Sequence, residues 1–384
     1  MELQIYDSAL NELGIVDEFK SLIWTPRFYE VGSFELQAPM TENNIALLQK
    51  HRYIYRPDVE ETAFIKSVSE ATQDGEQLIV VSGAMLEGLL DKRTITGKGY
   101  SSSLRDTLKM YIEDIQGVYS FGYKGMSVEI SDGDDCQNWG GESAVGQNLG
   151  EYARGLLRAE NRAVKIKFYP EQKKMVCRFV SGTDRSTEQQ ANPHVIFSEE
   201  NKNICNVNYS YSEEGCCSLA ECWADYKDVA VDSSKAGMLK VALGGRDYSG
   251  GQYLDGLELT NWFGTEEAVI VEETEVRHNE DGSVYTVIVK KIDYEATYEK
   301  LLAVCKQHYC PCTESFDGTL IGDGYRNEWQ LGDYVTVEDA RRGTFYKKQA
   351  EEVTEAFEAS GKRVDVTLGA SLKTVIDLIR EAKK

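Results

Sequence analysis

The chain has 384 residues, of which 41% are hydrophobic and 28% charged, and it contains 22 tyrosines and 5 tryptophans. This balance excludes a disordered chain and predicts two or more β-rich domains. The net charge of −22 argues against a protein that grips DNA phosphates. No run of 18 apolar residues is present, and the N-terminus lacks the basic and apolar regions of a secretion signal. We therefore expect folding in a bacterial cytoplasm, with the nine cysteines mostly as free thiols.

The first part of the chain has the pattern of strands and turns. Strand candidates lie at residues 3–6, 21–39, 53–56, 62–69 and 77–82. The first long candidate is divided by Gly32, which we interpret as a turn. The pair around residues 73–75 predicts a hairpin, because Asp-Gly is a strong turn signal.

Helical spacing of apolar residues marks several segments. These are residues 41–50, 104–115, 149–157, 294–309 and 371–384. In the first of them, Thr41 is the candidate cap and Ile45 and Leu48 are predicted to share the inner face. The next two segments predict a helical insertion at residues 101–162. The last predicts an amphipathic C-terminal helix.

Strands return after the helical insertion. Candidates lie at residues 164–169, 175–180, 204–211 and 218–226, and a long hairpin is predicted at residues 269–291 with its turn at 279–282. Polar residues 181–193 predict a surface loop. The glycine-rich residues 244–256 predict a loop or linker.

Residues 349–368 are ambiguous between helix and strand. Residues 349–359 have a helix-favouring composition, whereas residues 363–368 alternate apolar and polar positions. We predict a β-hairpin that turns near residues 360–362, with Val353 and Phe357 facing inward. A helix at residues 349–359 would make this prediction wrong.

One stretch resembles a phosphatase motif. Residues 315–320 (SFDGTL) resemble the Asp-x-Asp-Gly-Thr-Leu motif of haloacid-dehalogenase phosphatases. That chemistry needs a carboxylate nucleophile at the first position, where this chain has Ser315, and no apolar strand precedes the motif. We therefore predict a glycine turn between strands.

The sequence contains candidates for two kinds of metal site. A calcium loop is suggested by Asp132, Asp134, Asp135 and Glu142. It lacks the oxygen ligand and the glycine that an EF-hand needs, because Cys136 and Gln137 occupy those positions. Zinc is suggested by two groups, Cys305, His308, Cys310 and Cys312, and Cys216, Cys217 and Cys222. The Cys-Pro-Cys spacing is too tight for a zinc knuckle, so we predict buried thiols that pack as small hydrophobic side chains.

Other catalytic motifs also fail at an essential position. Residues 97–99 (GKG) lack the Ser/Thr of a phosphate-binding loop, and in residues 141–146 the second glycine comes one residue too late for a nucleophile elbow. The four histidines, His51, His194, His278 and His308, have no triad setting. We predict no catalytic residue, no cofactor and no bound metal.

Both ends of the chain resemble the ReqiPepy-type hub proteins of siphophage tail tips. The N-terminal matches are residues 14–24 (GIVDEFKSLIW), 27–36 (RFYEVGSFEL), 39, 65–68, 81–86 and 90–95. The C-terminal matches are residues 331–337 (LGDYVTV), 352–355 and 364–369 (VDVTLG). They occur in order at both ends, whereas the middle of the chain matches only in outline.

The resemblance implies a β-rich α+β fold with two tube-like β-barrel domains and a helical insertion, similar to the baseplate hub of contractile phages. We place the first tube-like domain at residues 1–100, the helical insertion at 101–162 and a β-rich segment that completes or bridges the first domain at 163–235. The second tube-like domain follows at residues 236–370 and the C-terminal helix at 371–384.

The resemblance also implies a structural, non-enzymatic role at the virion tail tip. Such hubs are homotrimers that contact the tail tube, distal tail and tape measure proteins and a tip or receptor-binding protein. DNA passes through the lumen without specific binding, which suits the acidity of this chain.

Two alternatives remain open, a tail-associated cell-wall hydrolase and a host-surface carbohydrate-binding module. A hydrolase predicts a deep pocket of convergent polar groups. A hub predicts self-complementary side surfaces. A binding module predicts a monomer with an aromatic platform.

Overall fold

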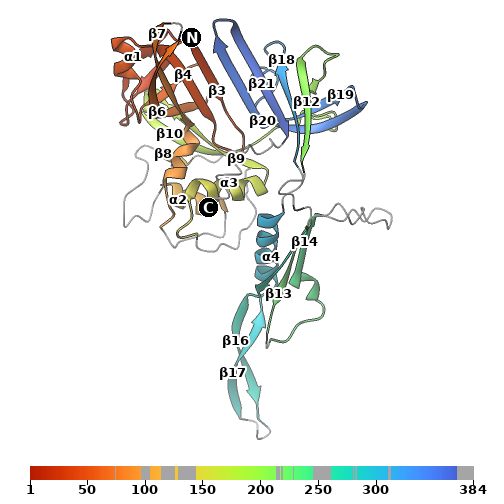
Figure 1. The fold of residues 1–384 in the computed structure, drawn as a ribbon. Helices are drawn as coiled ribbons and strands as arrows, with labels where there is room; N and C mark the ends of the chain where they lie inside the picture. Colours follow the sequence, from red (N-terminus) through yellow and green to blue (C-terminus); the bar gives the residue numbers. More distant parts are fainter. Residues whose placement is uncertain are drawn as a thin grey trace. The chain divides into compact units, whose positions relative to one another are not determined.

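The computed structural model forms two compact units (Figure 1). Unit 1 comprises residues 1–137, 141–211 and 314–384, and unit 2 comprises residues 138–140 and 212–313. The structure describes residues 1–73, 75–96, 104–113, 126–128, 144–212, 217, 219–227, 229–244, 261–279, 281, 283–309 and 313–369. None of the helices in these ranges is long and apolar enough to cross a membrane. The predicted domain boundaries stay a prediction.

A 13-stranded sheet dominates unit 1. Its strand order is β12 (Ile204–Ser212), β18 (Thr313–Leu320), β21 (Gly361–Gly369), β20 (Thr344–Glu358), β3 (Ser21–Thr25), β4 (Ser33–Pro39), β7 (Glu76–Met85), β6 (Thr62–Gln73), β5 (Tyr53–Tyr55), β1 (Leu3–Tyr6) and β2 (Glu12–Val16). Off this path, β19 (Tyr334–Asp339) pairs with β20 and with β11 (Ile196–Phe197). The predicted β-rich class is confirmed. The two ends of the chain share one sheet, because β20 pairs antiparallel with β3.

The described part of unit 1 also contains a smaller sheet and three α-helices. The sheet contains β8 (Met126–Val128), β10 (Lys174–Ser181) and β9 (Arg162–Tyr169), and the helices are α1 (Glu42–Leu47), α2 (Leu104–Glu113) and α3 (Leu149–Ala159). The two helices predicted within residues 101–162 are confirmed as α2 and α3. The same stretch also contains a strand, β8, which pairs parallel with β10.

The predicted inner face of α1 is partly wrong. Thr41 caps the helix as expected, since its hydroxyl accepts a hydrogen bond from the Asn44 amide at 3.1 Å. Leu47 and Leu48 are buried, whereas Ile45 is 39% exposed. The helix is only six residues long, and the side that holds Asn44 and Leu47 turns inward, which carries Ile45 toward solvent.

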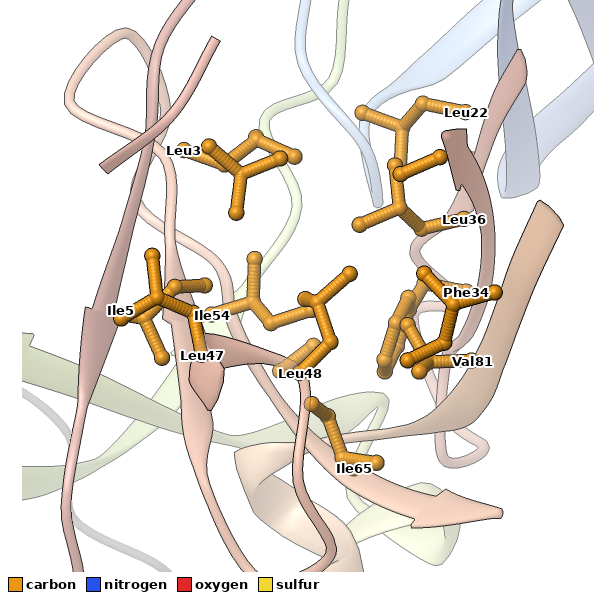
Figure 2. Packing of buried hydrophobic residues seen from close by; sticks show 14 of the residues in the cluster. Leu3, Ile5, Leu22, Phe34, Leu36, Leu47, Leu48, Ile54, Ile65 and Val81 are labelled. Carbon is orange, nitrogen blue, oxygen red and sulfur yellow. The ribbon is translucent and has the colours of Figure 1, made fainter. Parts of the chain in front are cut away.

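The N-terminal strands surround an apolar core. Its buried members include Leu3, Ile5, Val16, Leu22, Trp24, Phe34, Leu36, Leu47, Leu48, Ile54, Ile65 and Val81. Figure 2 shows several of these side chains packed together between the strands. In β4 every second residue is buried, which is the period of a strand with one face on the core. Burial of each large aliphatic side chain contributes about 1.5–3 kcal/mol.

The hairpin at residues 349–368 is confirmed. In the β20–β21 pair Glu358 lies opposite Gly361, so residues 359 and 360 form the turn. Val353 is fully buried and Phe357 packs against the N-terminal core. Residues 349–358 form a strand despite their helix-favouring composition, because β20 has paired strands on both sides, β21 and β3.

In its described residues, unit 2 contains two small sheets and one α-helix. The first sheet has the order β14 (Lys240–Gly244), β13 (Leu219–Asp225) and β15 (Asn261–Glu267), and the second is the hairpin of β16 (Ile270–His278) and β17 (Val284–Ile292). Helix α4 (Tyr294–His308) begins after Asp293, whose carboxylate accepts a hydrogen bond from the Ala296 amide at 3.1 Å. The predicted hairpin at 269–291 and helix at 294–309 are thus confirmed. The predicted C-terminal helix at 371–384 and nearly all of the glycine-rich segment 244–256 lie outside the described residues.

Two glycines of unit 1 allow backbone strain to be tested separately from packing. A Cβ on Gly361 or on Gly155 would meet no atom within 4 Å, but only Gly361 has a left-handed backbone, with φ of +116°. We predict that Gly361→Ala lowers the free energy of unfolding by about 1 kcal/mol or more. Gly155→Ala, inside α3, should raise it by about 0.5–1 kcal/mol. Denaturant midpoints measure both, and a shift of the same sign in the two variants would contradict the prediction.

Candidate functional site

The described cysteines of unit 2 serve its core. Cys222 and Cys305 are fully buried beside Ala220, Val241 and Leu301. The Cys305 thiol donates to the Val241 carbonyl at 3.5 Å, and burial raises its pKa to about 11. The predicted packing role of these two thiols is confirmed.

Among the remaining zinc candidates, His308 is described by the structure, whereas three cysteines are not. The His308 ring stacks on Trp262 with ring centroids 3.8 Å apart. Cys216, Cys310 and Cys312 lie outside the described residues. In the ranges that the structure describes, no three Cys, His, Asp or Glu side chains are grouped to hold a metal ion. The absence of a metal therefore stays a prediction.

The predicted glycine turn at residues 315–320 is wrong, because the whole stretch lies inside strand β18. Asp317 accepts a hydrogen bond from the Thr367 hydroxyl at 2.6 Å, across the β18–β21 pair. Gly318 is required by packing, since a Cβ there would lie 2.6 Å from Cδ1 of Ile204 in β12. The resemblance to a phosphatase motif thus reflects strand packing.

Several other motif positions lie outside the described residues, and two of the histidines lie far apart in the chain. Asp132, Asp134, Asp135, Glu142, the glycine-lysine-glycine at 97–99 and Gly141 lie outside the described residues. His194 lies in a surface loop, where its ring contacts the Gln189 carbonyl at 2.6 Å. His278 ends β16 opposite Val284. These histidines occupy separate elements.

A buried charge cluster in unit 1 has no counterpart in the sequence predictions. The Arg56 side chain is fully buried and contacts Asp58 at 2.6 Å and Glu355, also buried, at 3.2 Å. Arg326 joins the same Glu355 at 3.1 Å to Glu61 at 3.0 Å. The Arg56–Glu355–Arg326 cluster therefore connects the segment between β5 and β6 to strand β20.

The electrostatics of the Arg56–Glu355–Arg326 cluster favour its charged form. Burial by itself opposes ionisation of Glu355, but Arg56 and Arg326 outweigh it and hold the pKa of this carboxyl below its ordinary value. Arg326 has a left-handed backbone, with φ of 70°, an uncommon conformation that its two ion pairs help to hold. The guanidinium of Arg56 also lies 5.3 Å from the Trp24 ring and 5.0 Å from the Phe357 ring. The cluster is a structural clamp, since all of its charges are used in contacts within the chain.

A second buried carboxyl lies between η1 (Leu86–Lys92) and β9. Burial raises the pKa of Glu87, although Lys165 at 3.9 Å opposes this rise. Its Oε1 accepts a hydrogen bond from the Ile166 amide at 3.4 Å. Glu87 thus also anchors one element to another.

The edges of the sheets offer surfaces for assembly. Within the described residues the strand order of the large sheet ends at β2 and β12. Leu13 and Ile15 on β2 and Tyr211 on β12 are exposed. Edge strands have unpaired backbone groups and readily accept another strand. The two edge strands are therefore a candidate functional feature of unit 1.

Residues 2–103 and 124–221, more than half of the chain, match the family described as Siphovirus ReqiPepy6 Gp37-like protein. The chain belongs to this family. The predicted relationship to siphophage tail proteins is thereby confirmed. No curated protein matches the sequence of this family member.

Solved structures of two prophage tail proteins and of a further tail protein share the fold of this chain. The prophage tail protein gp18 from Listeria monocytogenes EGD-e has a TM-score of 0.57 at 14% identity, covering 100% of this chain and 99% of that one. The 43 kDa tail protein of prophage MuSo2 from Shewanella oneidensis has a TM-score of 0.53 at 13% identity, with 96% and 98% covered. The tail protein from Neisseria meningitidis MC58 has a TM-score of 0.51 at 12% identity, with 96% of each chain covered. These likenesses establish the fold over nearly the whole chain.

Neutralising Glu355 tests the clamp. Glu355→Gln removes the carboxylate that Arg56 and Arg326 share, whereas Arg56 keeps Asp58 and Arg326 keeps Glu61. We predict a loss of about 1.5–3 kcal/mol in unfolding free energy, because hydrogen bonds to charged groups are lost in a buried setting. The matched control is Glu76→Gln, which removes an exposed ion pair with Lys20 at 2.6 Å and should cost less than about 1 kcal/mol. Equal denaturant midpoints for the two variants would show that the clamp contributes little.

Acid should remove the stability that Glu355 provides. Its pKa is lower in the folded chain than the ordinary value of 4.5. The contribution is therefore complete above about pH 4.5 and is lost as the pH falls through the folded pKa. We expect the stability difference between the parent chain and Glu355→Gln to shrink below about pH 4.5. Denaturant titrations across this range measure it, and a constant difference down to about pH 3 would contradict the assignment.

Alkylation should distinguish the buried thiols from an accessible one. Cys177, Cys222 and Cys305 are buried, whereas Cys205 is partly exposed. At about pH 8 the raised pKa of Cys305 leaves few thiolates, and burial blocks the reagent. Peptide mass spectrometry after iodoacetamide treatment should show Cys205 modified well before the other three. Rapid labelling of Cys305 in the folded chain would be inconsistent with its position in the core.

Proposed function

We propose that this chain is the structural hub at the distal end of a phage or phage-like tail, where it joins the tail tube to the tip and lines the DNA channel. The observation that carries this proposal is family membership, and a fold shared with phage tail proteins over at least 96% of the chain supports it. The hub would lie at the virion tail tip and be assembled in the host cytoplasm.

The proposed hub is a homotrimer in which each copy supplies two tube-like β-barrel domains. Unit 1 supports this arrangement because its large sheet has two separate apolar cores. One core draws on residues 3–85 and the other on residues 195–368. The edges at β2 and β12 would gain partners when neighbouring copies close a ring.

The proposed partners are the tail tube, distal tail and tape measure proteins above and a tip or receptor-binding protein below. The net charge of −22 supports a channel that DNA crosses without binding, since a lumen of that sign repels phosphates. We further propose that the chain is not an enzyme. In support, Glu355, Glu87 and Cys305, whose pKa values are shifted, all serve packing or ion pairs.

Imaging of assembled tails tests the hub. We expect this chain in three copies around the channel at the distal end, between the tube and the tip. The test is a cryo-electron-microscopy reconstruction of intact tails with the chain located by its fold. Six copies, or a position on the outside without contact to the channel, would overturn the proposal.

A further inference from the structure

The hairpin of β16 and β17 in unit 2 has two open edges (Figure 1). Its strands pair from Ile270 opposite Ile292 to His278 opposite Val284. Among the described residues no third strand joins either side. A two-stranded sheet standing alone is marginal in water, and an open edge is a template for another strand. Both edges of the hairpin are therefore candidate surfaces for pairing with another strand.

Both faces of the hairpin carry exposed apolar side chains. Val276 lies opposite Thr286 and diagonally between Val284 and Ile288, so these three share one face, on which Glu272 also lies opposite Lys290. The three apolar side chains are 59%, 59% and 67% exposed. The other face holds the exposed Tyr285 and Lys291, which pairs with Glu273 at 2.8 Å and Glu275 at 3.0 Å. Neither face is covered by another described strand.

The two edges carry opposite charge. Strand β16 (IVEETEVRH) has three glutamates and one arginine, whereas β17 (VYTVIVKKI) has two lysines and no acid. Pairing β16 with the β16 of a second copy would set glutamates against glutamates. Pairing β17 with β17 would set lysines together, and like charges across a strand pair are destabilising. Only β17 of one copy against β16 of the next brings lysines to glutamates.

Pairing of β17 with the β16 of the next copy is also compatible with a closed ring. Because β16 and β17 run antiparallel, adding β17 of one copy antiparallel to β16 of the next leaves every hairpin pointing the same way. Such head-to-tail contacts close into a ring when the rotation between copies closes. A closed ring removes both open edges and gives the hairpins a common interior.

We propose that the β16–β17 hairpin pairs with the same hairpin of neighbouring copies, β17 of one against β16 of the next. The inference rests on the proposed self-assembling hub and names the strands through which copies meet in unit 2.

Two charge variants of the full chain test the pairing. Variant A is Lys290→Glu with Lys291→Glu, and variant B is Glu272→Lys with Glu273→Lys and Glu275→Lys. Each variant has two edges of one sign, so each should self-associate about tenfold more weakly than the parent, the equivalent of about 1.4 kcal/mol. Sedimentation over a concentration series measures this, with circular dichroism to check folding.

Mixing variants A and B is the decisive step. The acidic β17 of A fits the basic β16 of B, and the basic β17 of B fits the acidic β16 of A. In a mixed ring of three copies two of the three contacts are then complementary, so association should recover in part and exceed that of either variant alone. Repair of the hairpin within a chain cannot cause this recovery, because each chain keeps its own mismatched strands. Lys50→Glu with Lys202→Glu is the matched control, since both lysines are exposed in unit 1, and it should associate like the parent.

A second measurement covers the case in which variant A or B does not fold. The parent association should weaken with added salt, whereas that of the neutral variant Lys290→Gln with Lys291→Gln should respond less. A parent that stays monomeric, a variant A that associates like the control, or an A and B mixture without recovery would each overturn the pairing.

The outcome is independent of the tail imaging. If imaging shows a trimer around the channel but its association does not depend on the hairpin charges, the pairing is wrong and the hub proposal stands. If association recovers in the mixture but imaging places the chain outside the channel, the hub proposal is wrong and the pairing stands.

Discussion

The pairing of β20 with β3 is the constraint on which unit 1 depends, and the ion pair of Arg56 with Glu355 links the same two parts of the chain. The two strands come from opposite ends of the sequence. A buried ion pair that loses one partner is strongly destabilising. The packing around Arg56 therefore depends on the C-terminal hairpin as well as on the N-terminal strands.

This dependence favours cooperative formation of unit 1. Phe357 packs against the N-terminal core, so even the apolar cluster of the first strands draws on the last hairpin. Contacts between residues so far apart in sequence are slow to form, because a long loop must close before they stabilise anything. A truncated chain would expose the β3 edge and the Arg56 charge together.

The sequence predicted elements whose pattern is local. Alternation at residues 363–368 identified the C-terminal hairpin, and Thr41 marked a helix start through the capping preference of short polar side chains. Strand β18 was missed, because Gly318 looks like a turn residue until Ile204 is seen packed against it. Arg56, Glu355 and Arg326 have no local sequence signal, since only the tertiary fold brings them together. The same holds for the hairpin edges, whose opposite charges have meaning only once strand order is known.

Strands β12 and β18 are neighbours in the large sheet, although unit 2 lies between them in sequence. A segment that leaves and re-enters a sheet at adjacent strands can lengthen, shorten or be exchanged without shifting the register of the rest. The stretch between β12 and β18 can thus change in length or structure while unit 1 stays constant. The fold thereby separates a part under strict packing constraint from a part whose variation leaves the large sheet intact.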